Sequence, residues 1–592
     1  MKNFRKLNRN LLVVWITKGG IYMATTLDKV DVVTVGVGWT GGIIAAECAK
    51  SGLKVVGLER GKERSTADYL RVHDEYRYAI RYDLMQDLSK ETITFRNNRK
   101  MRALPMRQMG SFLLGEGLGG AGTHWNGQTW RFLPYDFEIK SMTEKKYGKN
   151  KLSEDYLLQD WGITYDELEP YFDKFEKTAG LSGDEKNPFA GKRSSPYPTP
   201  AMKKTPILQK FETATSSLGY TPFMLPSANL SETYTNPDGE SIAACQYCGF
   251  CERFGCEYGA KTSPEITVIP TARKTGNFDV RFHANVVEVL KEGDKVMGVR
   301  YIDNQTGEEF IQPAEVVVLT SYVMNNAKLL MVSDIGEQYE PDTQKGTLGK
   351  NYAYQILPGA TGFFDEQMNV FMGAGSLGMT IDDLNGDNFD HGDLDFIHGG
   401  SISITQTGTR PIETNPIPPD TPVWGAEFKK ASIHNYSRTL NVSTEGASMP
   451  HKENFLALDR DYKDAYGVPL LQLTYNFTDQ DRNLHKYLTE KTTAIMKEMG
   501  AKTVMAGNPI TEYDIVPYQT THNTGGTIMG ASPEDSVVNN YLQHWNADNL
   551  FVVGAGNFAH NSGYNPTGTV GALAYRAAEG IIKYSKDGGS LV

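Results

Sequence analysis

This chain of 592 residues has few cysteines, no long apolar run and fewer basic than acidic residues. Its five cysteines are too few for a disulfide scaffold, and four of them fall within residues 245–256. No apolar run approaches the roughly 20 residues of a membrane-spanning helix. A formal net charge of −11 and a pI near 5.6 argue against nucleic acid as a partner. The length predicts about two to four domains, and we expect a small-molecule ligand.

The N-terminal segment is basic and then briefly apolar, which resembles a weak signal peptide. Its apolar stretch, residues 11–16, is short and no cleavage-site pattern follows, so we do not expect secretion. Codons for residues 18–20 are compatible with a ribosome-binding sequence just before Met23. We therefore predict that residues 1–27 are an extension and that translation begins at Met23.

A complete βαβ pattern follows this extension. A β-branched run at 30–35 leads into Gly36-x-Gly38-x-x-Gly41, an apolar helix and a second strand that ends at Glu59. Such glycines permit a tight turn and a close approach of the backbone to a pyrophosphate, and the acidic residue accepts ribose hydroxyls. The pattern predicts a dinucleotide site without separating NAD from FAD. Cys48 lies on the helix and is interpreted as a core residue.

A second glycine-rich segment, "GEGLGGAGTHWNGQTWRF", occupies residues 115–132. It favours a flavin, which is buried along its length, over NAD. Together with the first glycine motif and the C-terminal "HNTGGTIMG" and "GAGNFAHNSGYNPTGTVGALA", it resembles the glucose-methanol-choline oxidoreductases over nearly the whole chain. Within that family, "WRF" and "TGGTIMG" resemble the bacterial sugar and sugar-acid dehydrogenases.

The resemblance implies an FAD-binding role for several further residues. In some members a Thr-His-Trp in the second glycine loop carries FAD covalently through its histidine, so His124 is a candidate attachment point; the alternative is a buried histidine beside noncovalent FAD. Thr320 to Tyr322 replace small residues at a family strand, which argues against the family's contact at that strand. Gly554 replaces an acidic residue, so only backbone contact is expected at its segment. The implied FAD-contacting residues of these segments are Gly119, Gly120, Thr123, His124, Asn126, Val286, Gly554, Ala555 and Thr567.

The candidate catalytic residues are His522 and Asn565. Alcohol oxidation needs a base for the hydroxyl proton, and histidine accepts protons near neutrality. The family resemblance implies that His522 is this base and that Asn565 orients the substrate oxygen, while hydride passes to flavin N5. His560, five residues before Asn565, is the rival base.

The cysteine cluster, Cys245-x2-Cys248-x2-Cys251-x4-Cys256, departs by one residue from a bacterial ferredoxin pattern. Structural zinc usually joins two separated C-x2-C pairs, and a second pair is missing. The family branch carries an iron–sulfur cluster in a similar insertion, so we predict such a cluster. Zinc and free thiols are the alternatives. A cluster would favour a dehydrogenase over an oxidase.

The predicted fold class is α/β with an α+β second domain. The Rossmann-like FAD-binding domain is expected in three pieces, 28–190, 263–349 and 506–592, the last with the catalytic pair. Residues 191–262 form a cysteine-rich insertion, and residues 350–505, with "SISITQ" and "PLLQLTYNF", an antiparallel sheet of the substrate domain. Residues 381–393 are predicted to be a surface loop and "DRNLHKYLTEKTTAIMKEMGA" a helix.

The expected activity is FAD-dependent oxidation of a secondary alcohol of a sugar acid or sugar, with gluconate as first choice. The alternatives are a hexose or glycoside dehydrogenase, a pyranose oxidase-like enzyme, a noncatalytic electron-transfer subunit and an NAD-dependent dehydrogenase. The expected partners are a small subunit and a cytochrome or quinone acceptor. We expect a bacterial protein, cytoplasmic or held peripherally at a membrane through that partner.

Overall fold

The computed structural model describes residues 12–17, 20–70, 84–107, 114–408, 414–517 and 520–592. The N-terminal strands β1 (Leu12–Thr17) and β2 (Gly20–Thr26) form an antiparallel hairpin, and β2 pairs with β15 (Glu309–Leu319). Residues 1–11 of the predicted extension lie outside the described residues, and the start at Met23 stays a prediction.

A ten-stranded sheet carries the predicted βαβ unit. Its parallel part has the order β26 (Ala547–Val552), β15, β3 (Val30–Val35), β4 (Val55–Leu58) and β12 (Phe278–Arg281). The remaining strands are β13 (Ala284–Glu292), β14 (Lys295–Asp303) and β25 (Gln543–His544). Val32 to Val35 of β3 and all of β4 are buried on both faces of the sheet, which explains why apolar residues there are not limited to alternate positions. Segments far apart in the sequence thus share one sheet.

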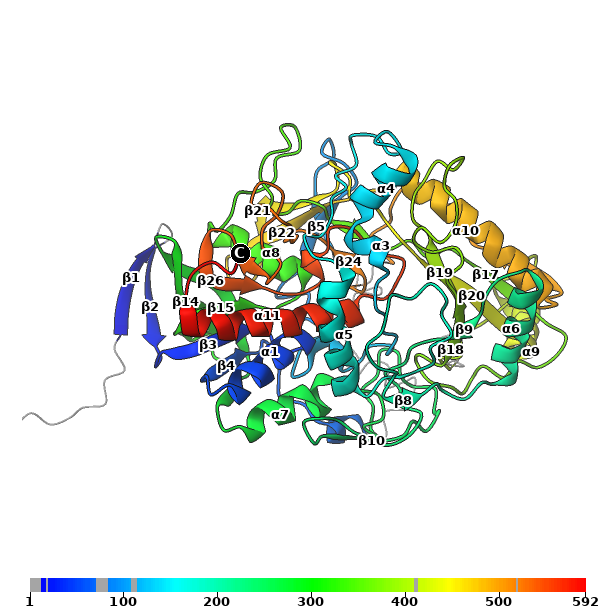
Figure 1. The fold of residues 1–592 in the computed structure, drawn as a ribbon, viewed down its shortest axis with the longest axis horizontal. Coiled ribbons are helices and arrows are strands. Elements are labelled where there is room, and N and C mark those ends of the chain that lie inside the picture. The colour runs from blue at the N-terminus through cyan, green and yellow to red at the C-terminus, as the bar shows by residue number, and fades with distance from the viewer. Residues whose placement is uncertain (1–11, 18–19, 71–83, 108–113, 409–413, 518–519) are drawn as a thin grey trace, which may run out of the picture.

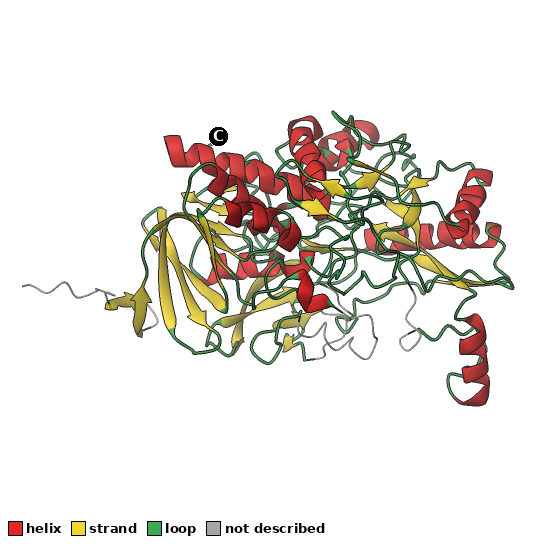
Figure 2. Cartoon of the chain, turned by 90° about the horizontal axis from the view of Figure 1, so that it is seen from below, coloured by secondary structure: helices red, strands yellow, loops and turns green. Residues whose placement is uncertain are grey.

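Helices cover this sheet in a separate layer, visible in Figures 1 and 2. Helix α1 (Trp39–Lys50) packs against α11 (Thr567–Asp587) and α7 (Val268–Lys274), and α11 packs against α5 (Tyr165–Ala179). Helix α8 (Val323–Val332) follows β15. Within the part of the chain that the structure describes, every helix is too short or too polar to cross a membrane.

A six-stranded antiparallel sheet forms the second large unit. Its order is β23 (Thr503–Ala506), β17 (Gly359–Phe363), β20 (Thr439–Gly446), β19 (Gly400–Thr405), β18 (Gly378–Ile381) and β9 (Phe223–Met224). Helix α10 (Asp479–Glu498) covers β17 and β20, and α6 (Pro206–Ser217) covers β18. The predicted strand "SISITQ" and the predicted helix over "DRNLHKYLTEKTTAIMKEMGA" are both confirmed.

The expectation was wrong for "PLLQLTYNF". Its strand, β22 (Pro469–Thr474), lies in a different, four-stranded sheet with β21 (Phe455–Lys463), β5 (Ile93–Arg96) and β6 (Leu104–Pro105). β22 runs parallel to β5 from the N-terminal part of the chain. Alternating apolar and polar residues indicate that one face of a strand is buried, but they do not indicate which sheet the strand joins.

Residues 381–393 were also predicted wrongly, because much of this loop is buried. Asp382 and Asn385 are fully buried, and His391 is almost so. The Asp382 carboxylate accepts hydrogen bonds from the Tyr564 hydroxyl at 2.5 Å and the Asn187 amide at 2.7 Å. Polar residues fit the interior here because hydrogen-bond partners satisfy them.

The remaining short elements are helices α3 (Pro134–Phe137), α4 (Ile139–Tyr147) and α9 (Gly425–Asn435), and strands β7 (Ser182–Gly183), β8 (Thr199–Pro200), β10 (Tyr234–Thr235), β11 (Ser241–Ile242), β16 (Ala353–Tyr354) and β24 (Asn523–Thr524).

Candidate active site

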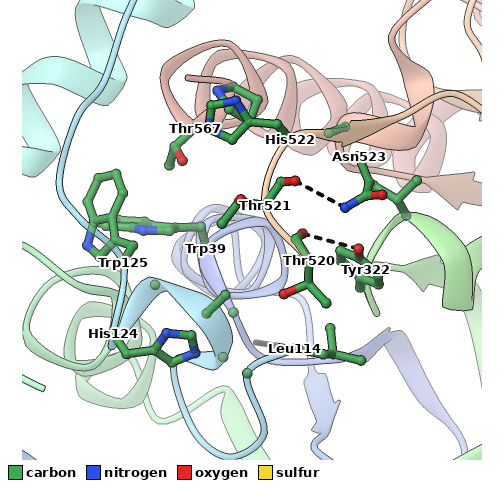
Figure 3. Close-up of a pocket in the computed structure, with 18 of the residues that line it drawn as sticks. Trp39, Leu114, His124, Trp125, Tyr322, Thr520, Thr521, His522, Asn523 and Thr567 are labelled. Atoms are coloured by element: carbon green, nitrogen blue, oxygen red, sulfur yellow. Dashed lines mark hydrogen bonds between the residues drawn. The ribbon is translucent and has the colours of Figure 1, made fainter. Parts of the chain in front are cut away.

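A cavity of about 860 Å³ lies where the parallel strands end and the antiparallel sheet begins. Residues after the carboxyl ends of β3, β4, β15 and β26 form one wall, and residues of β17, β19 and β20 form another. Ligands of open α/β sheets bind at this edge. In the view of Figure 3, His522 and Thr567 lie at the upper edge of the pocket and His124 at the lower left.

Two of the three glycines of the first motif, Gly36 and Gly41, leave no room for a side chain. Gly36 has φ +97°, and a Cβ there would lie 2.8 Å from the Thr320 carbonyl oxygen. A Cβ on Gly41 would lie 2.1 Å from the Gly36 carbonyl oxygen, whereas Gly38 faces the second glycine loop. The motif therefore has the close-packed form of a nucleotide cradle, and the Thr320 hydroxyl fastens it by donating to the Gly36 carbonyl at 2.8 Å.

Glu59 lies at the end of β4 and lines the cavity. Its Oε1 accepts from the Gly61 and Gly117 amides at 2.9 and 3.1 Å, and its Oε2 accepts from the Val37 amide at 3.1 Å. The carboxylate therefore clamps the two glycine loops together. Since each carboxylate oxygen has two lone pairs, Oε2 retains capacity to accept a second hydrogen bond.

The second glycine loop lies against the first. Gly119 adopts φ +89° and donates its amide to the Val37 carbonyl at 2.9 Å. His124 and Asn126 line the cavity, and His124 Nε2 and Asn126 Oδ1 are buried with no hydrogen-bond partner among the described residues. Burial, the largest cause, lowers the pKa of His124 to about 3, so the ring is neutral. Unsatisfied buried polar atoms are what a bound ligand would complete.

The predicted FAD-contacting residues do not all face the cavity. Thr123 turns away, with its hydroxyl 3.3 Å from Glu265, and Gly41 and Gly119 stand behind the wall. The predicted residues that line it are Gly36, Gly38, Glu59, Gly120, His124, Asn126, Val286, Gly554, Ala555 and Thr567.

The predicted catalytic pair meets on the cavity wall. The amide Nδ2 of Asn565, just before α11, lies 3.0 Å from Nε2 of His522. His522 has φ +58°, a strained conformation outside glycine, and its carbonyl accepts a hydrogen bond from the Asn561 amide. Burial lowers the pKa of the His522 ring to about 3. The ring is therefore neutral, as a proton acceptor must be.

The structure adds two residues that the sequence reasoning missed. Glu445, on β20, lines the cavity, and its Oε2 lies 3.3 Å from Nδ1 of His522. The indole Nε1 of Trp130 donates to Oδ1 of Asn565 at 3.1 Å. Trp130 belongs to the "WRF" that carries the family resemblance, so a signal was present; nothing in the sequence around Glu445 marks it.

The rival His560 does not line the cavity. It is fully buried with Asp136 and His398, and these three form the one group of metal-ligand type within 4.8 Å that the described residues contain. Nδ1 of His560 accepts from Trp161 Nε1 at 3.2 Å, and Nδ1 of His398 accepts from the Gly399 amide at 2.9 Å. Each neutral ring therefore carries its proton on Nε2 and donates it to Asp136, so no lone pair remains for a metal.

The four clustered cysteines lie on one loop beside the second glycine loop. The Arg253 amide donates to the His124 carbonyl at 2.8 Å, and the buried Lys261 ammonium donates to the carbonyls of Trp125, Cys251 and Phe254 at 2.7 Å. Burial raises the pKa of Cys245 to about 12 and that of Cys251 to about 11. The four sulfur atoms are not among the described ligand groups within 4.8 Å, whereas tetrahedral zinc holds sulfurs about 3.8 Å apart. This arrangement disfavours zinc.

A nucleotide cradle that opens into a cavity with a neutral histidine on its wall is an arrangement that suits an oxidoreductase. Sequence profiles of GMC oxidoreductase match residues 159–356 and 450–574. The chain is 42% identical, over 97% of both chains, to the gluconate 2-dehydrogenase flavoprotein of Pantoea cypripedii. It therefore belongs to the GMC oxidoreductase family, as the sequence predicts.

Two further proteins extend the comparison. The fructose dehydrogenase large subunit of Gluconobacter japonicus is 27% identical over 96% of this chain and 100% of its own. The formate oxidase of Aspergillus oryzae RIB40, studied for modification of its FAD, shares the fold with a TM-score of 0.60 at 15% identity, covering 96% of this chain and 100% of that chain. The predicted fold class is confirmed. Membership of the GMC oxidoreductase family implies FAD as the cofactor.

Proposed function

We propose that this protein oxidises a secondary alcohol of a sugar acid or sugar, with FAD as the hydride acceptor. The observation that carries the proposal is the His522–Asn565 pair on the wall of the cavity that the nucleotide cradle opens into. A relative of 42% identity that is a gluconate 2-dehydrogenase flavoprotein supports gluconate as first choice. A hexose or glycoside is the second choice, supported by the fructose dehydrogenase relative.

The cavity fits FAD on three counts. Side chains at Gly36 and Gly41 would collide with the backbone, His124 and Asn126 carry unsatisfied buried atoms, and Glu59 keeps acceptor capacity for a ribose hydroxyl. FAD, when bound, supplies a two-electron acceptor for a hydride. The residues proposed to hold it are the predicted ones that line the cavity, namely Gly36, Gly38, Glu59, Gly120, His124, Asn126, Val286, Gly554, Ala555 and Thr567. Gly41, Gly119 and Thr123 shape the two glycine loops from behind this wall.

The chain's own contribution is proton removal and orientation. Nε2 of neutral His522 accepts the proton of the substrate hydroxyl, and the Asn565 amide donates a hydrogen bond to the same oxygen. Asn441 and Ser443 extend along β20 on the wall that also carries Glu445, as alternate residues of a strand do. Amide, hydroxyl and carboxylate groups in a row suit the hydroxyls of a polyol.

The test is turnover of the purified protein with an artificial electron-accepting dye. With gluconate, we expect dye reduction and a keto acid carrying the carbonyl at the secondary alcohol, identified by mass spectrometry. Turnover with fructose, glucose or glycosides but not gluconate would transfer the proposal to the second choice. A protein with bound FAD that oxidises none of these alcohols would support a noncatalytic electron-transfer subunit instead.

We further propose covalent attachment of FAD through His124. The support is that His124 lines the cavity and that its buried Nε2 has no hydrogen-bond partner among the described residues. After denaturation, the yellow colour should stay with the protein, and it should be released from a His124→Ala variant. Complete release from the unmodified protein would leave FAD noncovalent.

The cysteine loop is proposed to hold an iron–sulfur cluster through Cys245, Cys248, Cys251 and Cys256. Such a cluster binds cysteines to different iron atoms, which tolerates wider sulfur spacing than zinc. Electrons would then leave through a small subunit and a cytochrome or quinone, which would hold the protein at the membrane periphery. Iron and acid-labile sulfide in the purified protein, lost in a Cys251→Ser variant, test the cluster; their absence would leave free thiols.

A further inference from the structure

The hydrogen positions around His522 follow from Trp130. An indole Nε1 is a donor only, so the Asn565 atom 3.1 Å from it must be the carbonyl oxygen. The NH₂ group of Asn565 then faces His522, 3.0 Å from Nε2. A donor facing Nε2 requires that nitrogen to be an acceptor. The neutral His522 ring therefore carries its proton on Nδ1.

Trp130 is held firmly in this position. It is 4% exposed and stacks on Tyr564 with ring centroids 4.6 Å apart and an interplanar angle of 18°. The Tyr564 hydroxyl in turn donates to buried Asp382 at 2.5 Å. The loop around Asp382 thus fixes the indole, and the indole fixes the amide of Asn565.

Glu445 stands on the opposite side of the His522 ring. Its Oε2 is 3.3 Å from Nδ1, which is an ion-pair distance without hydrogen-bond geometry, and neither atom has a hydrogen-bond partner among the described residues. Asn565 also interacts with the Glu445 carboxyl, and Glu252 is the second acidic residue close enough to act on it. The carboxylate comes from the antiparallel sheet, whereas His522 and Asn565 come from the C-terminal segment.

We propose that Trp130 and Glu445 are positioning residues that set the proton of His522. Trp130 keeps the proton off Nε2, so that the lone pair of this nitrogen can accept a proton, and Glu445 supplies the negative charge that stabilises His522 once it is protonated. This deepens, and rests on, the proposed function. In the step itself the O–H bond of the substrate breaks, an Nε2–H bond forms, and the Nδ1 proton stays on His522; only a proton moves.

The electrostatics give this proposal a pH signature. Burial, the largest cause, raises the pKa of Glu445 to about 7, with Glu252 adding to the rise and Asn565 opposing it. His522 stays neutral across this range because burial lowers its pKa. Above about pH 7 Glu445 is ionised and stabilises a proton on His522; below it, this charge is lost. Proton removal should therefore speed up as pH rises through about 7.

The tautomer is tested without any substrate. The ¹⁵N spectrum of histidine-labelled holoenzyme, with the His522 signal assigned as the one missing from His522→Ala, should show Nδ1 protonated and Nε2 unprotonated. Trp130→Phe keeps the stacked ring but removes the N–H, and should give a mixture of tautomers. Trp161→Phe, which removes the same donor from His560, is the matched control and should leave the His522 signal unchanged. Nε2 protonated in the unmodified protein would overturn the proposal.

The role of the Glu445 charge is tested by anaerobic stopped-flow reduction of the flavin between pH 6 and 8. Glu445→Gln keeps the size and polarity of the side chain but removes the charge, and should slow reduction by about 100-fold at pH 8 and abolish the pH dependence. Glu252→Gln should keep the transition and shift it to lower pH, because one cause of the raised pKa is gone. An unchanged profile in Glu445→Gln would overturn the role of Glu445. If no alcohol reduces the flavin, the proposed function fails, while the tautomer measurement still decides the role of Trp130.

Discussion

His522 and His560 are both buried histidines beside a carboxylate in the same C-terminal part of the chain, yet their ring nitrogens are engaged differently. His560 is fully buried; Nδ1 accepts from Trp161 and Nε2 donates to Asp136. His522 has Nε2 turned to a cavity-lining amide and Nδ1 toward Glu445. In the group of Asp136, His398 and His560, which we call the closed centre, the histidine rings are bonded within the protein. His522 instead keeps an accepting nitrogen at a cavity wall.

The carboxylates beside these two histidines, Asp136 and Glu445, also differ in how their pKa values are shifted. The His398 and His560 side chains hold the pKa of Asp136 well below its usual range, against the opposing effect of burial. Burial raises the pKa of Glu445 instead. A paired carboxylate stabilises the fold, whereas a carboxylate that ionises near neutrality is suited to proton chemistry. Burial and a histidine neighbour alone therefore do not identify a catalytic group.

The largest expected effect separates the two histidines. His522→Ala should slow flavin reduction by about 10²–10⁴-fold, because the base is lost, while FAD content and Tm stay unchanged. His560→Ala, as the comparison variant, should lose stability before it loses the chemical step. Anaerobic stopped-flow reduction and a thermal melt of both variants measure this. Near-normal reduction in His522→Ala would transfer the role of base to His560.

Breaking the closed centre should cost stability rather than chemistry. Asp136→Ala leaves the Leu133 amide and the His398 and His560 rings without an acceptor, so we expect a loss of about 3 kcal/mol or more in the free energy of unfolding. Asp155→Ala, at an exposed ion pair with Lys452, is the control at about 1 kcal/mol or less. Urea unfolding measures both. Equal losses would contradict the structural role of Asp136.

Acid should destabilise the closed centre. Because the pKa of Asp136 is lower in the folded chain than its unfolded value of about 3.9, its contribution is complete above that value and falls as pH drops below it. The free energy of unfolding should therefore decline more steeply below about pH 4 in the unmodified protein than in Asp136→Asn. Chemical unfolding at a series of pH values tests this, and parallel curves would refute it.

The smallest expected effect concerns Glu445, whose ionisation lowers the free energy of unfolding, whereas that of Asp136 raises it. Because the pKa of Glu445 is raised, its ionisation disfavours the folded state as pH rises from its unfolded value toward about 7. Glu445→Gln should stabilise the protein by about 1 kcal/mol at pH 8 and by nothing at pH 4. Thermal melts at the two pH values measure the difference. Stabilisation of equal size at both values would remove the electrostatic explanation.

Local patterns explain which parts of the site were predictable. The cradle from Val30 to Glu59 is contiguous, and glycine spacing reports its turn, so sequence sufficed. The His522–Asn565 pairing came from motif order in a family resemblance. Glu445 reaches His522 only because β20 packs above a distant segment, which no local pattern records. For the same reason the sequence left His560 as a rival base.

The errors have a physical cause of the same kind. The polar residues 381–393 were predicted at the surface, but tertiary partners such as Tyr564 satisfy them inside. The strand of "PLLQLTYNF" joined β5, although its alternation fits either sheet equally well. Composition and periodicity describe what a segment needs, whereas its neighbours are set by the whole fold.

The most direct test of the central claim is anaerobic bleaching of the flavin absorbance by gluconate, fructose, glucose, glycosides and other polyols in turn. The account predicts that a sugar acid or sugar bleaches the unmodified protein, with gluconate first, and that the His522→Ala variant stays yellow on the same timescale. A flavin that no such alcohol bleaches, or one that bleaches equally fast without His522, would contradict it.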